Sequence, residues 1–182
     1  MGRFYNGDIE GKFWFAVQSS NDIEELVTVT PHIYYSWNVC GCTAEIHDYG
    51  YCKECYDSKE EHINAAIDED VYDDDGCLYY EDQMIGYSLD KETHYVELMN
   101  NLNELKQKIG EDIIEKFDKI ERNDDILNAF TGVFNHTHDC ENTTKTQEEI
   151  RNLMTLVARY TLGYQMEYCL QKNGYCNISC EY

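Results

Sequence analysis

The sequence has few basic residues, a single proline and no long hydrophobic run. Its 182 residues contain 14 Lys and Arg against 36 Asp and Glu, which gives a net charge of −22. Such an acidic surface repels phosphate backbones and anionic lipid headgroups, so it argues against extended nucleic-acid binding and against a polybasic membrane contact. We therefore expect no membrane association and a partner that is basic.

Membrane-spanning segments, targeting signals and catalytic motifs are also missing. No apolar run approaches the roughly 18 residues needed to cross a bilayer, and the N-terminus lacks the hydrophobic stretch of a signal peptide. The sequence contains no G-x-S-x-G, P-loop, G-x-G-x-x-G or H-E-x-x-H motif. We therefore expect a cytoplasmic protein that is not an enzyme.

The rest of the composition indicates a folded body with an uneven charge. Apolar residues make up 42% of the chain, enough to form a core, and the length fits one globular unit. Residues 60–90 contain eleven Asp and Glu and no Lys or Arg. We predict a β-rich segment with a cysteine hairpin at 1–59, an acidic segment at 60–90 and a helical region with a C-terminal strand at 91–182, together in one compact unit.

Aromatic, β-rich runs in the first third of the chain predict strands. They cover residues 12–18 and 33–39, and Pro31 precedes the second run, where a residue that cannot donate to a ladder is tolerated. Residues 175–182 alternate between apolar and polar side chains and predict a C-terminal strand, for which residues 12–18 are the expected partner.

From residue 90 onward, apolar side chains recur at three- and four-residue steps, the period of an amphipathic helix. A first helix is predicted between the cap Asp90 and Gly110, and the longest one runs from a capping box at 146–149 to Gly174. Shorter helices are predicted at 113–120, at 126–130 and, before the acidic run, at 59–67.

Four of the nine cysteines form two close pairs, Cys40-Gly41-Cys42 and Cys52-Lys53-Glu54-Cys55. Structural zinc is held by four tetrahedral sulfurs, and short spacing within each pair lets backbone amides turn toward the thiolates. The pattern predicts a structural zinc ion on Cys40, Cys42, Cys52 and Cys55, since four thiolates leave no position for a reacting water. His47 as a substitute ligand, unligated thiols and disulfides remain open alternatives.

The other five cysteines lack such spacing, and we expect core thiols at Cys77, Cys140, Cys169, Cys176 and Cys180. A second metal site remains open at Cys140 with His136 or His138. Taken together, the patterns predict an α+β fold. It has a scaffold of about four helices in the C-terminal two-thirds, a small N-terminal antiparallel sheet and a zinc-clipped hairpin.

The acidic segment has three open interpretations. Calcium is one, but aligning Gly76 with the EF-hand glycine puts Val71 at the first ligand position and Asp82 at the last, where Glu is required. A solvated loop is another, because water screens neighbouring carboxylates. The third is mimicry: a mostly helical segment would carry one charge per roughly 4 Å, close to the phosphate about every 3.4 Å along one DNA strand.

Tyrosines are interleaved with these carboxylates. Tyr72, Tyr79, Tyr80 and Tyr87 offer rigid contact area and stacking faces for Arg. Such a surface fits a cationic groove that otherwise holds nucleic acid. We therefore predict that the segment acts as a DNA mimic and binds its partner through Asp68, Glu69, Asp70, Tyr72, Asp73, Asp74, Asp75, Tyr79, Tyr80, Glu81 and Asp82.

Both ends of the chain, MGRFYNGDIEGKFWF at 1–15 and GYCNI at 174–178, are similar to those of small uncharacterised phage proteins. With its length and acidity, the sequence resembles anti-CRISPR proteins of the type II-A class, from gut-bacterial phages or mobile elements. The resemblance implies a viral inhibitor of the RNA-guided single-effector nuclease in a bacterial host cell. Because that nuclease holds nucleic acid in a positively charged channel, we expect the inhibitor to dock on the guide-loaded nuclease and hinder DNA engagement.

Two other classes of function remain open. One is a zinc-containing regulator that contacts DNA through a basic cluster formed by Lys106, Lys108, Lys116, Lys119 and Arg122. The other is a metal-dependent enzyme built on His136 and His138, with Asp139 and Cys140 beside them.

Overall fold

The computed structural model describes residues 4–13, 17–45, 50–72, 77–118 and 147–181. At residues 80–83 and 116–118 this description covers the backbone but not the side chains. The described residues form an α+β fold, as the sequence predicts. The strands are β1 (Phe4–Gly7), β2 (Gly11–Lys12), β3 (His32–Trp37), β4 (Thr43–Glu45), β5 (Tyr79–Asp90) and β6 (Tyr175–Glu181). The helices are the 3-10 helix η1 (Ser20–Ile23) and the α-helices α1 (Lys59–Asp68), α2 (Lys91–Ile109), α3 (Glu111–Asp118) and α5 (Gln147–Asn173).

The strands form one antiparallel sheet in the order β2-β1-β6-β5-β3-β4. Its central strands are β5 and β6, which pair from Met84 opposite Glu181 to Asp90 opposite Tyr175. The sheet is therefore not confined to the N-terminal part of the chain. The predicted partner of the C-terminal strand is also wrong: β6 pairs with β1 and β5, and among the described residues of the expected run 12–18 only Lys12 lies in a strand, β2.

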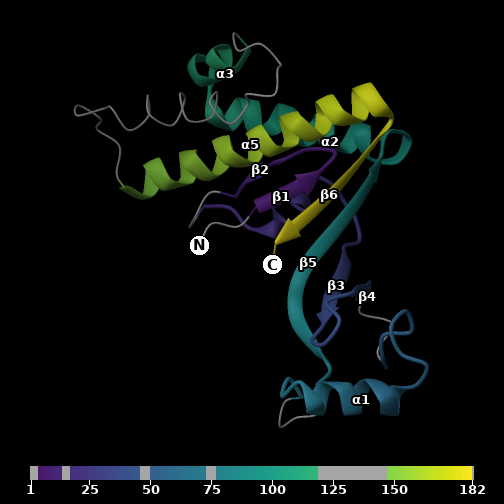
Figure 1. The fold of residues 1–182 in the computed structure, drawn as a ribbon. Helices are drawn as coiled ribbons and strands as arrows, with labels where there is room; N and C mark the ends of the chain where they lie inside the picture. The colour runs from purple at the N-terminus through teal and green to yellow at the C-terminus, as the bar shows by residue number, and fades with distance from the viewer. Residues whose placement is uncertain (1–3, 14–16, 46–49, 73–76, 119–146, 182) are drawn as a thin grey trace.

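Helices α2 and α5 pack against each other and cover one face of the sheet (Figure 1). The Asp90 side chain caps α2 by accepting from the amides of Glu92 and Thr93, and the helix ends at Gly110, as predicted. The two helices approach closely at Gly163, where a Cβ atom would lie 2.8 Å from Cδ2 of Leu102. These elements enclose the larger apolar core, which we call the main lobe.

A second, separate apolar cluster lies at the far end of β3 and β5, next to α1 (Figure 1). We call this part the small lobe, residues 35–79. Its described buried apolar side chains are Tyr35, Trp37, Cys52, Ala66 and Leu78. The β3–β5 ladder shifts register between Tyr34 and Ser36, where the chain passes from one lobe to the other. A bulge of this kind bends a strand, and it allows one long strand pair to serve two cores.

Candidate metal centre and acidic surface

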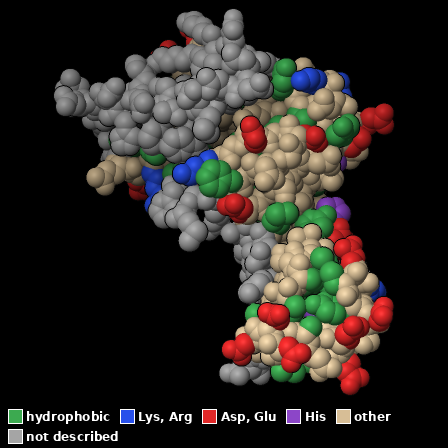
Figure 2. All heavy atoms as spheres, viewed as in Figure 1, with side chains coloured by type: hydrophobic (Ala, Val, Ile, Leu, Met, Phe, Trp, Pro, Cys, Tyr) green, Lys and Arg blue, Asp and Glu red, His purple; other side chains and the backbone are tan. Residues whose placement is uncertain are grey.

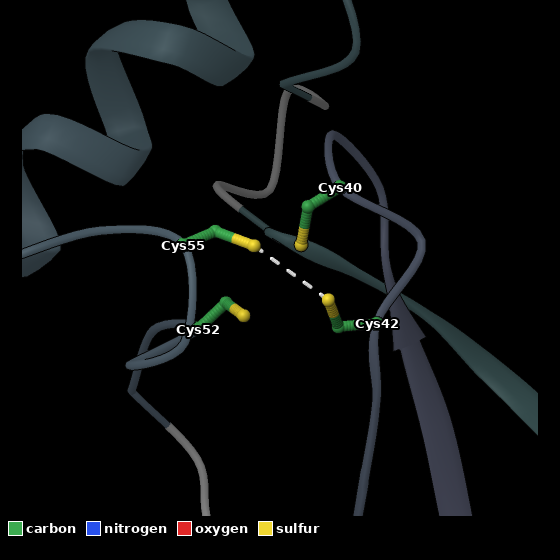
Figure 3. A group of neighbouring side chains, drawn as sticks. All are labelled: Cys40, Cys42, Cys52 and Cys55. Carbon is green, nitrogen blue, oxygen red and sulfur yellow. Dashed lines mark hydrogen bonds between the residues drawn. The ribbon is translucent and has the colours of Figure 1, made fainter.

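The four cysteines Cys40, Cys42, Cys52 and Cys55, which form two close pairs in the sequence, converge in the small lobe (Figure 3). Cys40 and Cys42 come from the turn between β3 and β4, and Cys52 and Cys55 from the loop before α1. All four Sγ atoms lie within 4.8 Å of one another, and those of Cys42 and Cys55 are 3.6 Å apart. Sulfurs at about 2.3 Å from a tetrahedral ion lie about 3.8 Å apart. The cluster is therefore close enough to hold one metal ion.

The Cys-Gly-Cys spacing is explained by the turn that it forms. The amide of Gly41 donates to the carbonyl of Trp37 at 2.8 Å, and the amide of Trp37 donates to the carbonyl of Cys42 at 3.0 Å. Gly41 has a φ of +68°, in the left-handed region that glycine adopts without strain. This turn places both thiols on the same side, facing the loop that carries Cys52.

Backbone amides prepare the cluster for negative charge. Burial works against a thiolate at Cys52, but hydrogen bonds from the amides of Glu54 and Cys55 and from the thiol of Cys40 prevail, and the pKa of Cys52 is lowered. Burial raises the pKa of Cys40, against a hydrogen bond from the amide of Cys42. A bound cation would displace the protons that remain on these thiols.

A histidine outside the predicted ligand set supports the cluster. The His62 ring on α1 is fully buried, and its Nδ1 accepts a hydrogen bond from the amide of Cys52 at 3.2 Å. The ring stacks on Tyr56 with centroids 4.3 Å apart and meets Trp37 edge-on at 5.0 Å. Burial lowers the pKa of His62, which keeps the imidazole neutral. Sequence analysis missed this residue, and His47 lies outside the described residues.

The acidic residues of the small lobe are exposed. Asp68, Glu69 and Asp70 lie at the C-terminal end of α1, where the helix dipole disfavours anions. These carboxylates therefore do not stabilise the helix. The exposed carboxylates described in the lobe are Glu45, Glu54, Asp57, Glu60, Glu61, Asp68, Glu69 and Asp70.

The structure corrects the expected form of the acidic segment. Among its described residues only those of α1 are helical, and residues 79–90 form β5, so the predicted helical charge spacing does not extend along the segment. Tyr72 is half-buried, and the Tyr79 ring packs 4.6 Å from that of Tyr35. Tyr87 offers no stacking face to a partner, since it is buried in the main lobe and donates to Glu24 at 2.8 Å. Outside the described residues or side chains lie Asp73, Asp74, Asp75, Tyr80, Glu81 and Asp82.

The residues of the alternative functions are only partly described. Nζ of Lys106 lies 5.9 Å from the ring centroid of Tyr160, and that of Lys108 lies 3.9 Å from Oε2 of Glu104, so both lysines already have partners. Outside the described residues or side chains lie Lys116, Lys119, Arg122, His136, His138, Asp139 and Cys140. The expected core thiols Cys169, Cys176 and Cys180 are buried in the main lobe, while Cys77 is half-buried in the small lobe.

Comparisons with known protein families, curated proteins and solved structures find no match to this chain. None of the helices that the structure describes combines the length and hydrophobicity needed to cross a bilayer. The chemistry of the small lobe is therefore the basis on which a function can be argued.

Proposed function

We propose that the protein is a non-enzymatic inhibitor, of phage or mobile-element origin, of a bacterial RNA-guided CRISPR effector nuclease. Its small lobe, held together by a structural zinc ion, docks in the cationic nucleic-acid channel of the guide-loaded nuclease and hinders engagement of target DNA. The observation that carries this proposal is the concentration of exposed carboxylates on one small lobe (Figure 2), with no Lys or Arg paired to them among its described residues.

The charge of the small lobe supports a basic partner. Residues 35–79 contain twelve Asp and Glu against two Lys, a net charge of −10. Among the described residues of the lobe, no Lys or Arg forms an ion pair with these carboxylates. Carboxylates without an internal counterion remain available to an external one, and a cationic groove gains affinity and association rate from them.

The cysteine cluster fits zinc by its donor set. Four thiols, of which Cys40 and Cys52 also accept hydrogen bonds from backbone amides, are the ligands that structural zinc prefers, and soft sulfur donors argue against calcium or magnesium. The ion would join the turn after β3 to the loop before α1, and its binding free energy would contribute to folding the lobe. With four thiolates, the loaded centre would carry a charge of about −2 and add to the acidity of the lobe.

The inhibitory mechanism follows from competition. The nuclease recognises its heteroduplex through the backbone and its PAM through arginines that contact bases. A rigid acidic lobe in that channel would contact the cationic side chains that otherwise bind DNA phosphates. Binding of target DNA is therefore hindered before any cleavage step. The lobe needs no catalytic residue for this effect.

Capture of the nuclease tests the proposal. The zinc-loaded protein, immobilised, should retain the guide-loaded single-effector nuclease. The triple variant Asp68→Asn, Glu69→Gln, Asp70→Asn should retain much less. A matched control, Glu10→Gln, Glu111→Gln, Asp112→Asn, makes the same charge change on exposed main-lobe residues and should behave like the parent. Failure of the parent protein to retain the nuclease, or equal losses in the two variants, would contradict the proposal.

A further inference from the structure

The interior of the small lobe contains one imidazole whose position packing alone does not explain. His62 has no exposed surface, lies between Tyr56 and Trp37, and uses Nδ1 to accept the amide of Cys52 at 3.2 Å. Its Nε2 has no hydrogen-bond partner within the described part of the chain. A buried polar atom without a partner is destabilising, and a phenylalanine would fill the same space without that penalty.

We infer that His62 is a positioning residue of the metal centre: its Nδ1 fixes the amide of Cys52, and with it the direction of the Cys52 sulfur. The inference rests on the proposed metal centre. Because the Cys52 amide is the donor, Nδ1 must be unprotonated, and the proton of the neutral ring must reside on Nε2. His62 therefore acts as the Nε2–H tautomer and does not ligate the ion.

The loop at Cys52 shows why such an acceptor is needed. The amides of Glu54 and Cys55 point at the Cys52 sulfur, whereas the amide of Cys52 itself points away from it, toward α1. Cys52 is the one buried member of the four cysteines, so its amide needs an acceptor inside the protein. His62 supplies that acceptor. Partners that orient metal ligands in this way are worth about 10–100-fold in metal affinity.

The same hydrogen bond connects the metal centre to the acidic surface. His62 lies in the first half of α1, and Asp68 ends that helix. Beyond the helix, the amides of Val71 and Tyr72 donate to the carbonyl of Ala66, and the Asn38 side chain donates to the carbonyl of Val71. Metal loading would thus fix α1 through His62, and α1 would fix the carboxylates at its end.

Two variants separate the acceptor from the packing. His62→Asn keeps an acceptor near the position of Nδ1 but loses the ring that stacks on Tyr56, whereas His62→Phe keeps the ring and loses the acceptor. Zinc affinity of the full-length protein is measured by competition with a chromophoric chelator. We expect His62→Phe to bind about 10–100-fold more weakly than the parent, and His62→Asn to recover most of that loss.

Spectroscopy provides a direct readout. In the zinc-loaded, 15N-labelled parent protein, a scalar coupling should join the Cys52 amide nitrogen to Nδ1 of His62, and the ring shifts should report the Nε2–H tautomer. The cobalt(II) spectrum should change in His62→Phe and resemble the parent in His62→Asn. If His62→Phe fails to fold, the coupling and the His62→Asn affinity still decide the question.

The outcomes distinguish this inference from the proposed metal centre. If the parent binds zinc but the coupling is absent, or if His62→Phe binds zinc as tightly as the parent, His62 is not a positioning residue and the metal centre stands. A variant His62→Asn no better than a folded His62→Phe would also overturn the inference. If the parent binds neither zinc nor cobalt, the metal centre and the inference both fall.

Discussion

Removing the metal should unfold the small lobe and leave the main lobe folded. Among the described residues, the small lobe fully buries only five apolar side chains, with others partly buried against them, and burial on this scale contributes on the order of 10 kcal/mol before any entropy cost is counted. Zinc binding to small domains contributes about 10–16 kcal/mol near neutral pH. The ion would therefore supply about as much stabilising free energy as the lobe's apolar core. The main lobe has its own larger core and no contact with the cysteine cluster among its buried residues.

Amide hydrogen exchange with and without a strong chelator measures this effect. After chelation, we expect the amides of α1 and β4 to lose protection, while those of α2, α5 and β6 keep theirs. The boundary should fall within β5, between Tyr79 in the small lobe and Met84, which pairs with β6.

Variants provide a second route to the same result. Cys52→Ser with Cys55→Ser should reproduce the effect of chelation, because both replaced thiols belong to the cluster. Cys77→Ser is the matched control, since its thiol lies outside the cluster and donates to the carbonyl of Tyr79, which a serine can also do. Equal protection of α1 with and without metal, or joint loss of protection in both lobes, would refute the reasoning.

Three further predictions concern charge, packing and pH. Neutralising the carboxylates at 68–70 should leave the free energy of unfolding unchanged or raise it by about 0.3–1 kcal/mol per charge, because the C-terminal end of α1 disfavours anions. A clear fall in Tm would contradict this. Gly163→Ala should cost about 1–3 kcal/mol in urea unfolding, since its Cβ would meet Leu102 at 2.8 Å; an unchanged midpoint would show that the helices adjust freely. Burial raises the pKa of Cys180 to about 12, so this thiol stabilises the fold below its unfolded pKa. That contribution should fall by roughly 1 kcal/mol per pH unit as pH rises from about 9 toward 12, and Cys180→Ala should show a shallower decline.

Helix ends were predictable because their signals are local. Asp90, Gly110 and Gly174 mark boundaries that the structure reproduces, since a cap acts on amides or carbonyls within one turn. The meeting of the four cysteines was also predictable. The two cysteines of each pair are brought together by their own short turn. The prediction therefore had to assume only that the two turns lie close to each other.

Strand partners were not predictable in this way, because the sheet joins segments that are far apart in the chain. Ile85, Tyr87 and Leu89 alternate with exposed or half-buried residues, which is a strand pattern. The acidic residues before them favoured an interpretation of the whole segment as a charged surface, and this strand was not predicted. His62 escaped notice for a similar reason: its partner Cys52 is ten residues away, and only the three-dimensional turn before α1 brings them together.

Target-DNA binding by the guide-loaded nuclease, measured by fluorescence anisotropy while the zinc-loaded protein is titrated in, tests the proposed competition most directly. We predict that DNA binding is lost as the inhibitor saturates the nuclease. Inhibition should weaken steeply as salt rises, since exposed charges are screened, and it should weaken when the carboxylates at 68–70 are neutralised. Unchanged DNA binding at saturating inhibitor, or inhibition insensitive to both salt and neutralisation, would contradict the role of the acidic small lobe.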